Sequence, residues 1–407
     1  MDMELLMMAL AFAGLAITVG CMTTGNGEKR KSGWTVENGN LSVFITEAGG
    51  HMAPVMFYRD TDEPVQPYYI SPWQQEDLEV SDPVLAPLRG DFFCLPFGAN
   101  AEPCKGRQYT GHGESASSIW ERVAEERNGK ITELTLVMKA KLDPGKVTKK
   151  VYVVDGRNVV YDTHIIEGYS GGMPLGHHAT LAVPEREGAM KVDVGRFDLG
   201  MTNPTLFSDP KNREYQSLAI GGEFDDLSRV PLIWKEPAYG DCSSYPRRRG
   251  FCDLLSVFKK PADTPAWTTA TYPDEGYLWF SLKDAAVLPA TVFWISNCGR
   301  HGSPWNGRNR CLGLEDVCAF FAAGVVESNG PNSVKDAGFP TTVELSPDAP
   351  TAVNYIQGVA KIPEGFDRVK DVRFGKNEVT FASASGKEVR VEVNHDFLRT
   401  GRPGGES

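Results

Sequence analysis

The sequence predicts an all-β chain built from many short antiparallel strands. The 27 prolines and 42 glycines are spread along the 407 residues, which favours turns between short strands over a helical bundle. Several segments alternate apolar and polar side chains with a period of two, whereas helical periodicity is rare. The best helical candidate, residues 333–338, is shorter than two turns. No short internal repeat appears, which disfavours a propeller or a solenoid.

The clearest predicted element is a hairpin in the first half of the chain. Segments 147–154 and 159–166 are rich in β-branched residues and flank Asp155-Gly156, a dipeptide that favours a tight hairpin turn. Four further segments have the apolar content or alternation of strands and are expected to form two more pairs. These pairs are 40–45 with 52–57, and 278–282 with 291–295.

The C-terminal part predicts an added β-meander packed on the main body. Segments 369–374, 378–381 and 388–393 alternate well and are separated by glycines. Residues 401–407 are expected to be disordered, as chain ends often are.

The N-terminal segment predicts export. Residues 5–20 form an apolar run of 16 residues, shorter than the roughly 20 residues needed to span a bilayer. Small residues then precede Cys21, which resembles a bacterial lipoprotein signal over residues 1–21. We therefore expect a periplasmic or cell-envelope protein, lipid-anchored through Cys21, with residues 22–32 as a flexible tether. An uncleaved membrane anchor is the alternative.

Net charge limits the classes of partner, and the cysteines allow disulfides. The formal net charge of −11 argues against a nucleic-acid partner. Export makes disulfides possible, and the pairs Cys94–Cys104 and Cys242–Cys252 would each close a loop. Seven cysteines follow Cys21, an odd number, so at least one stays free. Free buried thiols are the alternative for the others.

Three positions are candidates for general acid–base catalysis. His112 lies between two glycines, His177-His178 form a pair, and Glu315 lies in an apolar run. Two imidazoles and a carboxylate are what the opening of a sugar ring by general acid–base catalysis requires. Burial of Glu315 is costly without a task and raises its pKa. Adjacent strand residues point to opposite faces, so the histidine pair supplies at most one acid.

Longer segments around these positions resemble the galactose mutarotase-like, or aldose 1-epimerase, superfamily. The similar segments run from Arg89-Gly90 through 95–98 and His112-Gly113 to Trp120, then 174–179, and finally 311–315. The resemblance covers about residues 35–358. It implies a large antiparallel β-sandwich, the mutarotase-like supersandwich, over residues 33–361, with 362–407 as a C-terminal β extension.

The resemblance also implies roles for individual residues. Arg89 would bind a sugar hydroxyl, His112 would orient and polarise the substrate, His178 would be the general acid and Glu315 the general base. His178 is favoured over His177 as the acid because Gly176 then lies two residues before it, as in the family. His177 is kept as a binding residue. For Arg89, an ion pair with Asp91 or Glu315 is the structural alternative.

Two departures from the family pattern keep the reaction open. Residues 114–117, Glu-Ser-Ala-Ser, stand where the family has an aromatic residue, alanine and arginine, and Asp316 follows Glu315 where proline is common. These changes motivate the alternative of a carbohydrate-binding sandwich without turnover.

Three further side chains are candidates for sugar contacts. Trp305 is the preferred stacking platform because its Gly/Pro-rich neighbours predict an exposed loop. Trp73 is a second candidate platform, and His51, after Gly49-Gly50, is a candidate for the pocket edge.

The leading interpretation is an isomerase resembling aldose 1-epimerase that interconverts sugar anomers. Its substrate is expected to be a small neutral carbohydrate, because no basic cluster lies beside the motifs. We expect no cofactor and no metal, because the histidines lack the i, i+4 spacing of a helical metal site. A polysaccharide-acting enzyme is a third possibility. The sequence names neither the sugar nor the oligomeric state.

Overall fold

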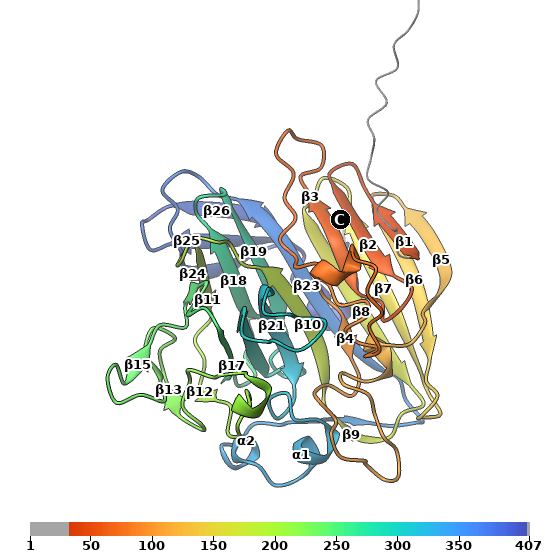
Figure 1. The fold of residues 1–407 in the computed structure, drawn as a ribbon. Helices are drawn as coiled ribbons and strands as arrows, with labels where there is room; N and C mark the ends of the chain where they lie inside the picture. Colours follow the sequence, from red (N-terminus) through yellow and green to blue (C-terminus); the bar gives the residue numbers. More distant parts are fainter. Residues whose placement is uncertain (1–31, 405–407) are drawn as a thin grey trace, which may run out of the picture. The chain divides into compact units, whose positions relative to one another are not determined.

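The computed structural model describes residues 32–404, which form two large antiparallel sheets and several small ones (Figure 1). The first large sheet has seven strands. Their order is β13 (Glu223–Phe224), β12 (Leu199–Thr202), β17 (Phe251–Phe258), β20 (Ala290–Asn297), β21 (Arg310–Cys318), β10 (Leu175–Ala182) and β4 (Phe93–Cys94). The second has nine strands. Their order is β16 (Ser244–Tyr245), β11 (Met190–Val194), β18 (Ala266–Tyr272), β19 (Tyr277–Lys283), β23 (Thr351–Lys361), β8 (Val159–Glu167), β7 (Lys146–Val154), β6 (Ile131–Lys139) and β5 (Glu121–Asn128).

The remaining elements are short. The small sheets comprise β1 (Gly33–Glu37), β2 (Leu41–Thr46) and β3 (Met52–Phe57); β14 (Val230–Pro231) and β15 (Tyr239–Gly240); β9 (Gly171–Met173) and β22 (Val343–Leu345); and β24 (Val369–Gly375), β25 (Glu378–Ser383) and β26 (Glu388–Glu392). The α-helices are α1 (Val325–Asn329), α2 (Ser333–Asp336) and α3 (Phe397–Thr400). Single 3-10 turns cover Pro72–Gln74, Glu114–Ala116 and Pro210–Asn212.

The two large sheets pack face to face around the main hydrophobic core. Ala179 and Leu181 of β10 and Leu314 of β21 belong to the same buried cluster as Val353 and Tyr355 of β23. The intervening residues of β10 and β21 point to the other face of the seven-stranded sheet, because side chains alternate along a strand. A second buried cluster covers that outer face, so the sheet separates two environments.

The C-terminal meander covers the outer face of the nine-stranded sheet. Phe381 of β25 packs on Phe280, with ring centroids 4.9 Å apart, and Phe397 of α3 packs on Tyr161 at 5.0 Å. The structure thus contains the predicted three-stranded extension. Residues 401–404 are described, and the Asn394 side chain donates a hydrogen bond to the Arg402 carbonyl at 2.8 Å, so the predicted disorder does not hold for them.

Most predicted strands are present, with one error of pairing. The Asp155-Gly156 turn joins β7 to β8, and β2 pairs with β3, as expected. Segments 278–282 and 291–295 are strands, but they lie in different sheets as β19 and β20. The chain crosses from one layer to the other between them, which local alternation does not reveal.

Other expectations concern termini and cysteines. The predicted signal over 1–21, Cys21 and nearly all of the tether lie outside the described residues. Within residues 32–404, no helix is both long and apolar enough to cross a membrane.

The seven described cysteines are all free, so the pairs Cys94–Cys104 and Cys242–Cys252 are not formed. Six of these thiols are buried, which matches the alternative of cysteine as a small core residue.

Candidate functional site

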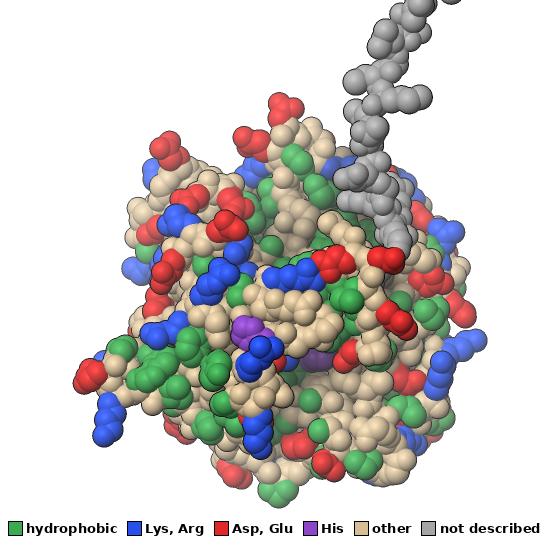
Figure 2. Space-filling model, in the orientation of Figure 1, with side chains coloured by type: hydrophobic (Ala, Val, Ile, Leu, Met, Phe, Trp, Pro, Cys, Tyr) green, Lys and Arg blue, Asp and Glu red, His purple; other side chains and the backbone are tan. Residues whose placement is uncertain are grey.

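A cavity of about 370 Å³ lies on the outer face of the seven-stranded sheet. His112, His178 and Glu315 all line it, together with aromatic and apolar side chains from several loops. Figure 2 shows histidine side chains reaching the surface near the middle of one face of the molecule. The three residues that the sequence singled out for acid–base chemistry therefore share one cavity.

His178 and Glu315 are brought together by strand register. They are directly opposed on β10 and β21, and His178 Nε2 lies 3.1 Å from Glu315 Oε1. The other ring nitrogen, Nδ1, lies 3.1 Å from the Thr180 hydroxyl on the same face of β10. Glu315 Oε2 has no hydrogen-bond partner among the described residues. One carboxylate oxygen thus orients the imidazole while the other has no partner of its own.

Gly313 makes room for this carboxylate. A Cβ atom at position 313 would lie 2.6 Å from Glu315 Oε1, closer than van der Waals contact permits. Gly313 and Glu315 lie on the same face of β21. A side chain at position 313 would therefore collide with the Glu315 carboxylate, which explains the glycine in the Cys-Leu-Gly-Leu-Glu segment.

Burial sets the protonation of the pair. Glu315 is 2% exposed, and burial raises the pKa of its carboxyl well above the usual range. Burial also lowers the pKa of His178 well below its usual value, and the neighbouring His112 adds to this effect. Between those two pKa values the pair holds one proton, which the 3.1 Å contact allows the two side chains to share.

His112 is presented by a strained turn. Its φ is +56° and that of Gly113 is +77°, and a Cβ at position 113 would lie 2.0 Å from the Leu95 carbonyl oxygen. The His112 ring lies 4.9 Å from that of His178 and 5.1 Å from that of Phe97. Burial lowers its pKa to about 4, so the ring is neutral near pH 7. Its Nδ1 has no hydrogen-bond partner in residues 32–404.

Aromatic rings form one wall of the cavity. Phe92 lies between two imidazoles, stacked on His178 at 4.5 Å and on His51 at 4.0 Å. Trp305 and Trp294 pack edge to face at 5.7 Å, and the Arg300 guanidinium lies 5.6 Å from the Trp305 ring centroid. The cavity therefore combines flat apolar surfaces with a few polar groups, which suits a small polar ligand.

The comparisons with known proteins concern the fold. No family model matches the chain, and no curated protein matches it in sequence. A galactose mutarotase-like protein from Clostridium acetobutylicum matches in structure with a TM-score of 0.54 and 12% identity, over 81% of this chain and 95% of that one. A galactose mutarotase related enzyme from Lactobacillus acidophilus has a TM-score of 0.51 and 13% identity, over 81% and 98%. A candidate aldose 1-epimerase from Klebsiella pneumoniae has a TM-score of 0.56 and 11% identity, over 80% and 78%.

The chain has the galactose mutarotase-like fold. At 11–14% identity the similarity shows the architecture alone.

Within this mutarotase-like sandwich, four predicted binding residues do not line the cavity. Arg89 is buried, and its guanidinium donates to Gln74 Oε1 at 2.7 Å and to backbone carbonyls; no carboxylate in the described chain forms an ion pair with it. Burial lowers the pKa of Arg89 to about 10. A role for Arg89 in holding a sugar hydroxyl does not fit this geometry, and neither does the alternative ion pair.

The other three lie behind the first layer of side chains. His177 is fully buried and faces the nine-stranded sheet, because it alternates with His178 along β10. His51 lies behind Phe92, its Nε2 2.9 Å from the Ala116 carbonyl oxygen, and burial lowers its pKa to about 3. Trp73 packs against Trp305 at 4.9 Å. Direct sugar contacts by these side chains do not fit the geometry, whereas Trp305 does line the cavity, as a buried residue and not an exposed one.

The residues after His112-Gly113 serve the fold. The Glu114 carboxylate accepts hydrogen bonds from the backbone nitrogens of Lys141 and Leu142 at 2.9 and 3.0 Å. The Ser115 carbonyl accepts a hydrogen bond from Trp120 Nε1 at 3.0 Å. This part of the departure from the family pattern therefore fixes a turn and does not face the cavity.

Sequence reasoning missed Phe92, Trp294 and Arg300 as cavity residues. Phe92 was hidden inside an apolar run, and Trp294 was assigned only to a strand. Arg300 stands five residues before Trp305, so its place in the Gly/Pro-rich loop was the signal that could have found it.

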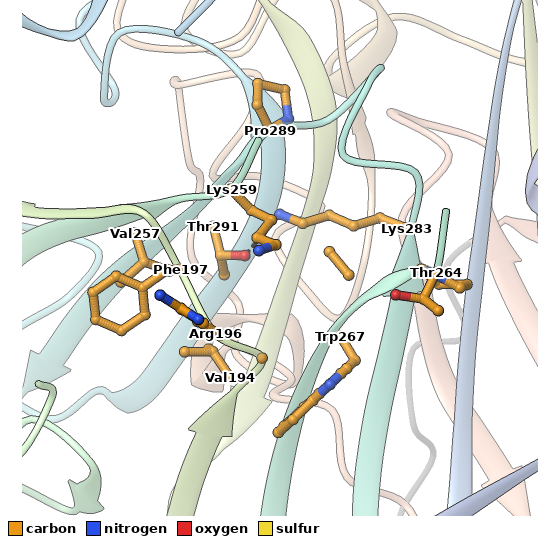
Figure 3. A pocket seen from close by; sticks show the side chains of 13 residues that line it. Val194, Arg196, Phe197, Val257, Lys259, Thr264, Trp267, Lys283, Pro289 and Thr291 are labelled. Carbon is orange, nitrogen blue, oxygen red and sulfur yellow. Dashed lines mark hydrogen bonds between the residues drawn. The ribbon is translucent and has the colours of Figure 1, made fainter. Parts of the chain in front are cut away.

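A second pocket, of about 170 Å³, offers no comparable chemistry (Figure 3). Lys283 crosses it, and its ammonium group donates to the Thr291 hydroxyl at 2.7 Å. Arg196, Lys259 and Trp267 are among the other lining residues, but no histidine or carboxylate lines it. The cavity with Glu315 is therefore the better candidate for acid–base catalysis.

Proposed function

We propose that the chain is a carbohydrate isomerase of the aldose 1-epimerase type, which interconverts sugar anomers by opening and closing the ring. The observation that carries this proposal is the His178–Glu315 contact of 3.1 Å inside a cavity lined by aromatic rings. The mutarotase-like fold supports it as an analogy only.

The proposed reaction needs one base and one acid on neighbouring oxygens of the sugar. The one proton of the pair first passes from Glu315 to His178 across their 3.1 Å contact. Glu315 then takes the proton from the C1 hydroxyl, and His178 gives its proton to the ring oxygen as the bond between that oxygen and C1 breaks. Rotation about the C1–C2 bond followed by the reverse transfers closes the ring in the other anomer. The C1 hydroxyl oxygen and the ring oxygen are both bonded to C1 and therefore lie close together, as His178 Nε2 and Glu315 Oε1 do. Each full cycle returns both protons, so no cofactor is required.

The remaining cavity groups would position the sugar. The neutral His112 ring offers an unpartnered Nδ1 beside His178, suited to holding a hydroxyl or the developing carbonyl oxygen. Trp305 offers an apolar face on which the C–H face of a pyranose can pack. We expect a neutral sugar. Because Arg300 lines the cavity, an anionic analogue is the natural comparison.

The test is polarimetric mutarotation of a panel of aldoses and one aldose phosphate. Wild type should accelerate at least one of them, and Glu315→Gln should lose about 100-fold or more of that acceleration, at the scale of removing one general base. Glu344→Gln is the matched control because it makes the same change at an exposed carboxylate. Equal rates for Glu315→Gln and wild type on every active sugar would exclude the assigned base.

The second candidate function is carbohydrate binding without turnover. The hydrogen bond from Arg89 to Gln74 favours this second function. The resemblance assigns Arg89 to substrate binding, but its guanidinium is bound to Gln74 instead. Calorimetric binding of a sugar that wild type does not mutarotate would support this candidate, and accelerated mutarotation would exclude it.

We also propose that the chain is exported and lipid-anchored through Cys21. Metabolic labelling with a fatty acid should mark the wild-type chain and not Cys21→Ala. Equal labelling of the two would remove the anchor from the proposal.

A further inference from the structure

A second group of ionisable side chains lies between the two large sheets, behind the cavity. It contains Asp91, which precedes β4, together with Asp162 of β8 and His177 of β10. All three are 0% exposed, and one potential ligand atom from each lies within 4.8 Å of the others. Three segments that are distant in sequence thus converge on one sealed position.

The hydrogen bonds of this group are incomplete. His177 Nδ1 lies 2.9 Å from Asp91 Oδ2, and the Gln357 amide donates to the same oxygen at 3.0 Å. Four atoms are left without a hydrogen-bond partner in the described chain: Asp91 Oδ1, both carboxylate oxygens of Asp162 and His177 Nε2. A carboxylate only accepts, so the hydrogen of the His177–Asp91 contact sits on Nδ1.

Three of the four leftover atoms are carboxylate oxygens, which accept hydrogen bonds and do not donate them. Buried acceptors with no donor between them are costly, and natural folds rarely leave them so. Lys149 is the nearby cation, but its ammonium group donates to the Gly50 carbonyl at 2.9 Å.

A neighbouring carboxylate shows how the same core satisfies such a group. Asp316 Oδ1 lies 2.6 Å from Lys283 Nζ and accepts a hydrogen bond from the Thr291 hydroxyl at 2.7 Å. Its Oδ2 accepts from Ser281 at 2.7 Å and from Tyr355 at 2.8 Å. Every oxygen of Asp316 is partnered, whereas Asp162 interacts with the side chain of Gln357, whose amide donates at 3.0 Å to Asp91, and no donor stands within hydrogen-bond geometry of its own two oxygens. This difference sets the Asp162 site apart as one prepared for a ligand.

We propose that Asp91, Asp162 and His177 bind one divalent transition-metal ion, with zinc the expected metal, as a structural ion between the two sheets. Two carboxylates and one imidazole are donors that suit zinc or manganese. Ligands at about 2.1 Å from zinc lie at most about 4.2 Å apart, so the 4.8 Å group needs a contraction of roughly half an ångström to close on the ion. The site has no opening for substrate, so the ion would fix strands β8 and β10 and not act in the reaction.

The expectation of no metal rested on the lack of histidines at helical spacing. Here the donors come from a loop and two strands of different sheets, and only the fold brings them together. This inference does not depend on the proposed isomerase activity.

The test uses the full-length chain without a polyhistidine tag, unfolded in guanidinium with a chelator and refolded with zinc or with chelator. Elemental analysis after desalting should find about one zinc ion per chain, and the zinc-refolded sample should have the higher melting temperature. Asp162→Asn should lose the ion and this difference, whereas the matched control Asp348→Asn, the same change at an exposed carboxylate, should keep both. Cobalt refolded into wild type should give visible absorption that His177→Asn abolishes.

Two results would overturn the proposal. One is a wild-type chain that refolds fully, holds neither zinc, manganese nor cobalt, and melts at the same temperature with and without metal. The other is full zinc stoichiometry in both Asp162→Asn and His177→Asn. If neither variant folds, the metal content and melting temperature of wild type still decide the question.

Discussion

The substitution Gly313→Ala tests whether the position of the Glu315 carboxylate matters. The added Cβ would lie 2.6 Å from Glu315 Oε1 and 3.1 Å from Trp294 Cβ, whereas ordinary contact begins at 3.4 Å. The Trp294 Cβ is fixed by its own backbone, so the carboxylate is the group that must move, by about 0.8 Å.

A shift of this size is large for acid–base chemistry. The displaced oxygen is the one that lies 3.1 Å from His178 Nε2, so its contact with the imidazole would be disturbed. Misplacement of a reacting group by about 1 Å can cost roughly 100-fold in rate, which corresponds to about 2.7 kcal/mol in activation free energy. No group that would bind the sugar elsewhere in the cavity is altered.

The assay is steady-state polarimetry on the best aldose, with the melting temperature measured in parallel. We expect kcat to fall about 100-fold while KM changes little. Gly302→Ala is the matched control, because a Cβ there meets nothing within 4 Å. An unchanged kcat for a folded Gly313→Ala protein would refute the positional role given to Glu315.

Three further outcomes follow from the same geometry. Burial raises the pKa of Glu315 in the folded chain, so its contribution to stability is complete below the unfolded pKa near 4.5 and is lost as pH rises. Urea unfolding should therefore show Glu315→Gln gaining stability relative to wild type above pH 4.5, by up to about 1.4 kcal/mol per pH unit. A stability difference between the two proteins that does not change with pH would contradict this. Trp305→Ala should raise KM several-fold with little change in kcat, and a loss confined to kcat would argue against a stacking platform. Asp316→Asn should cost about 3–5 kcal/mol in the free energy of unfolding because it leaves the buried Lys283 without its partner, and a cost below about 1 kcal/mol would mean that the pair is not intact.

The strands and the residues of the acid–base pair could be predicted from local sequence. Period-two alternation and the Asp155-Gly156 turn follow from backbone chemistry, which acts over a few residues. Glu315 stood out because a carboxylate in an apolar strand is costly, and alternation along a strand limits His177-His178 to one acid. The choice of His178 came from Gly176, which lies two residues before it as in the family that the sequence resembles. The cavity side of β10 and β21 carries the pair, as this reasoning requires.

What local sequence could not show is which strands share a sheet and which side chains meet across it. The wrong pairing of 278–282 with 291–295 and the hidden position of Arg89 both depend on the crossing between layers. The Asp91–Asp162–His177 group depends on contacts between positions up to 86 residues apart, and no spacing rule finds it. The place of Phe92 in the cavity wall follows from its stacking on two imidazoles, a contact that the sequence does not show.

The most direct test of the central claim is the exchange rate between the α and β anomers of an aldose at equilibrium, measured by NMR exchange spectroscopy. The account predicts exchange cross-peaks with wild type and Glu344→Gln, and none above the spontaneous rate with Glu315→Gln. Equal exchange with Glu315→Gln and wild type, both folded, would contradict the assignment of Glu315 as the base.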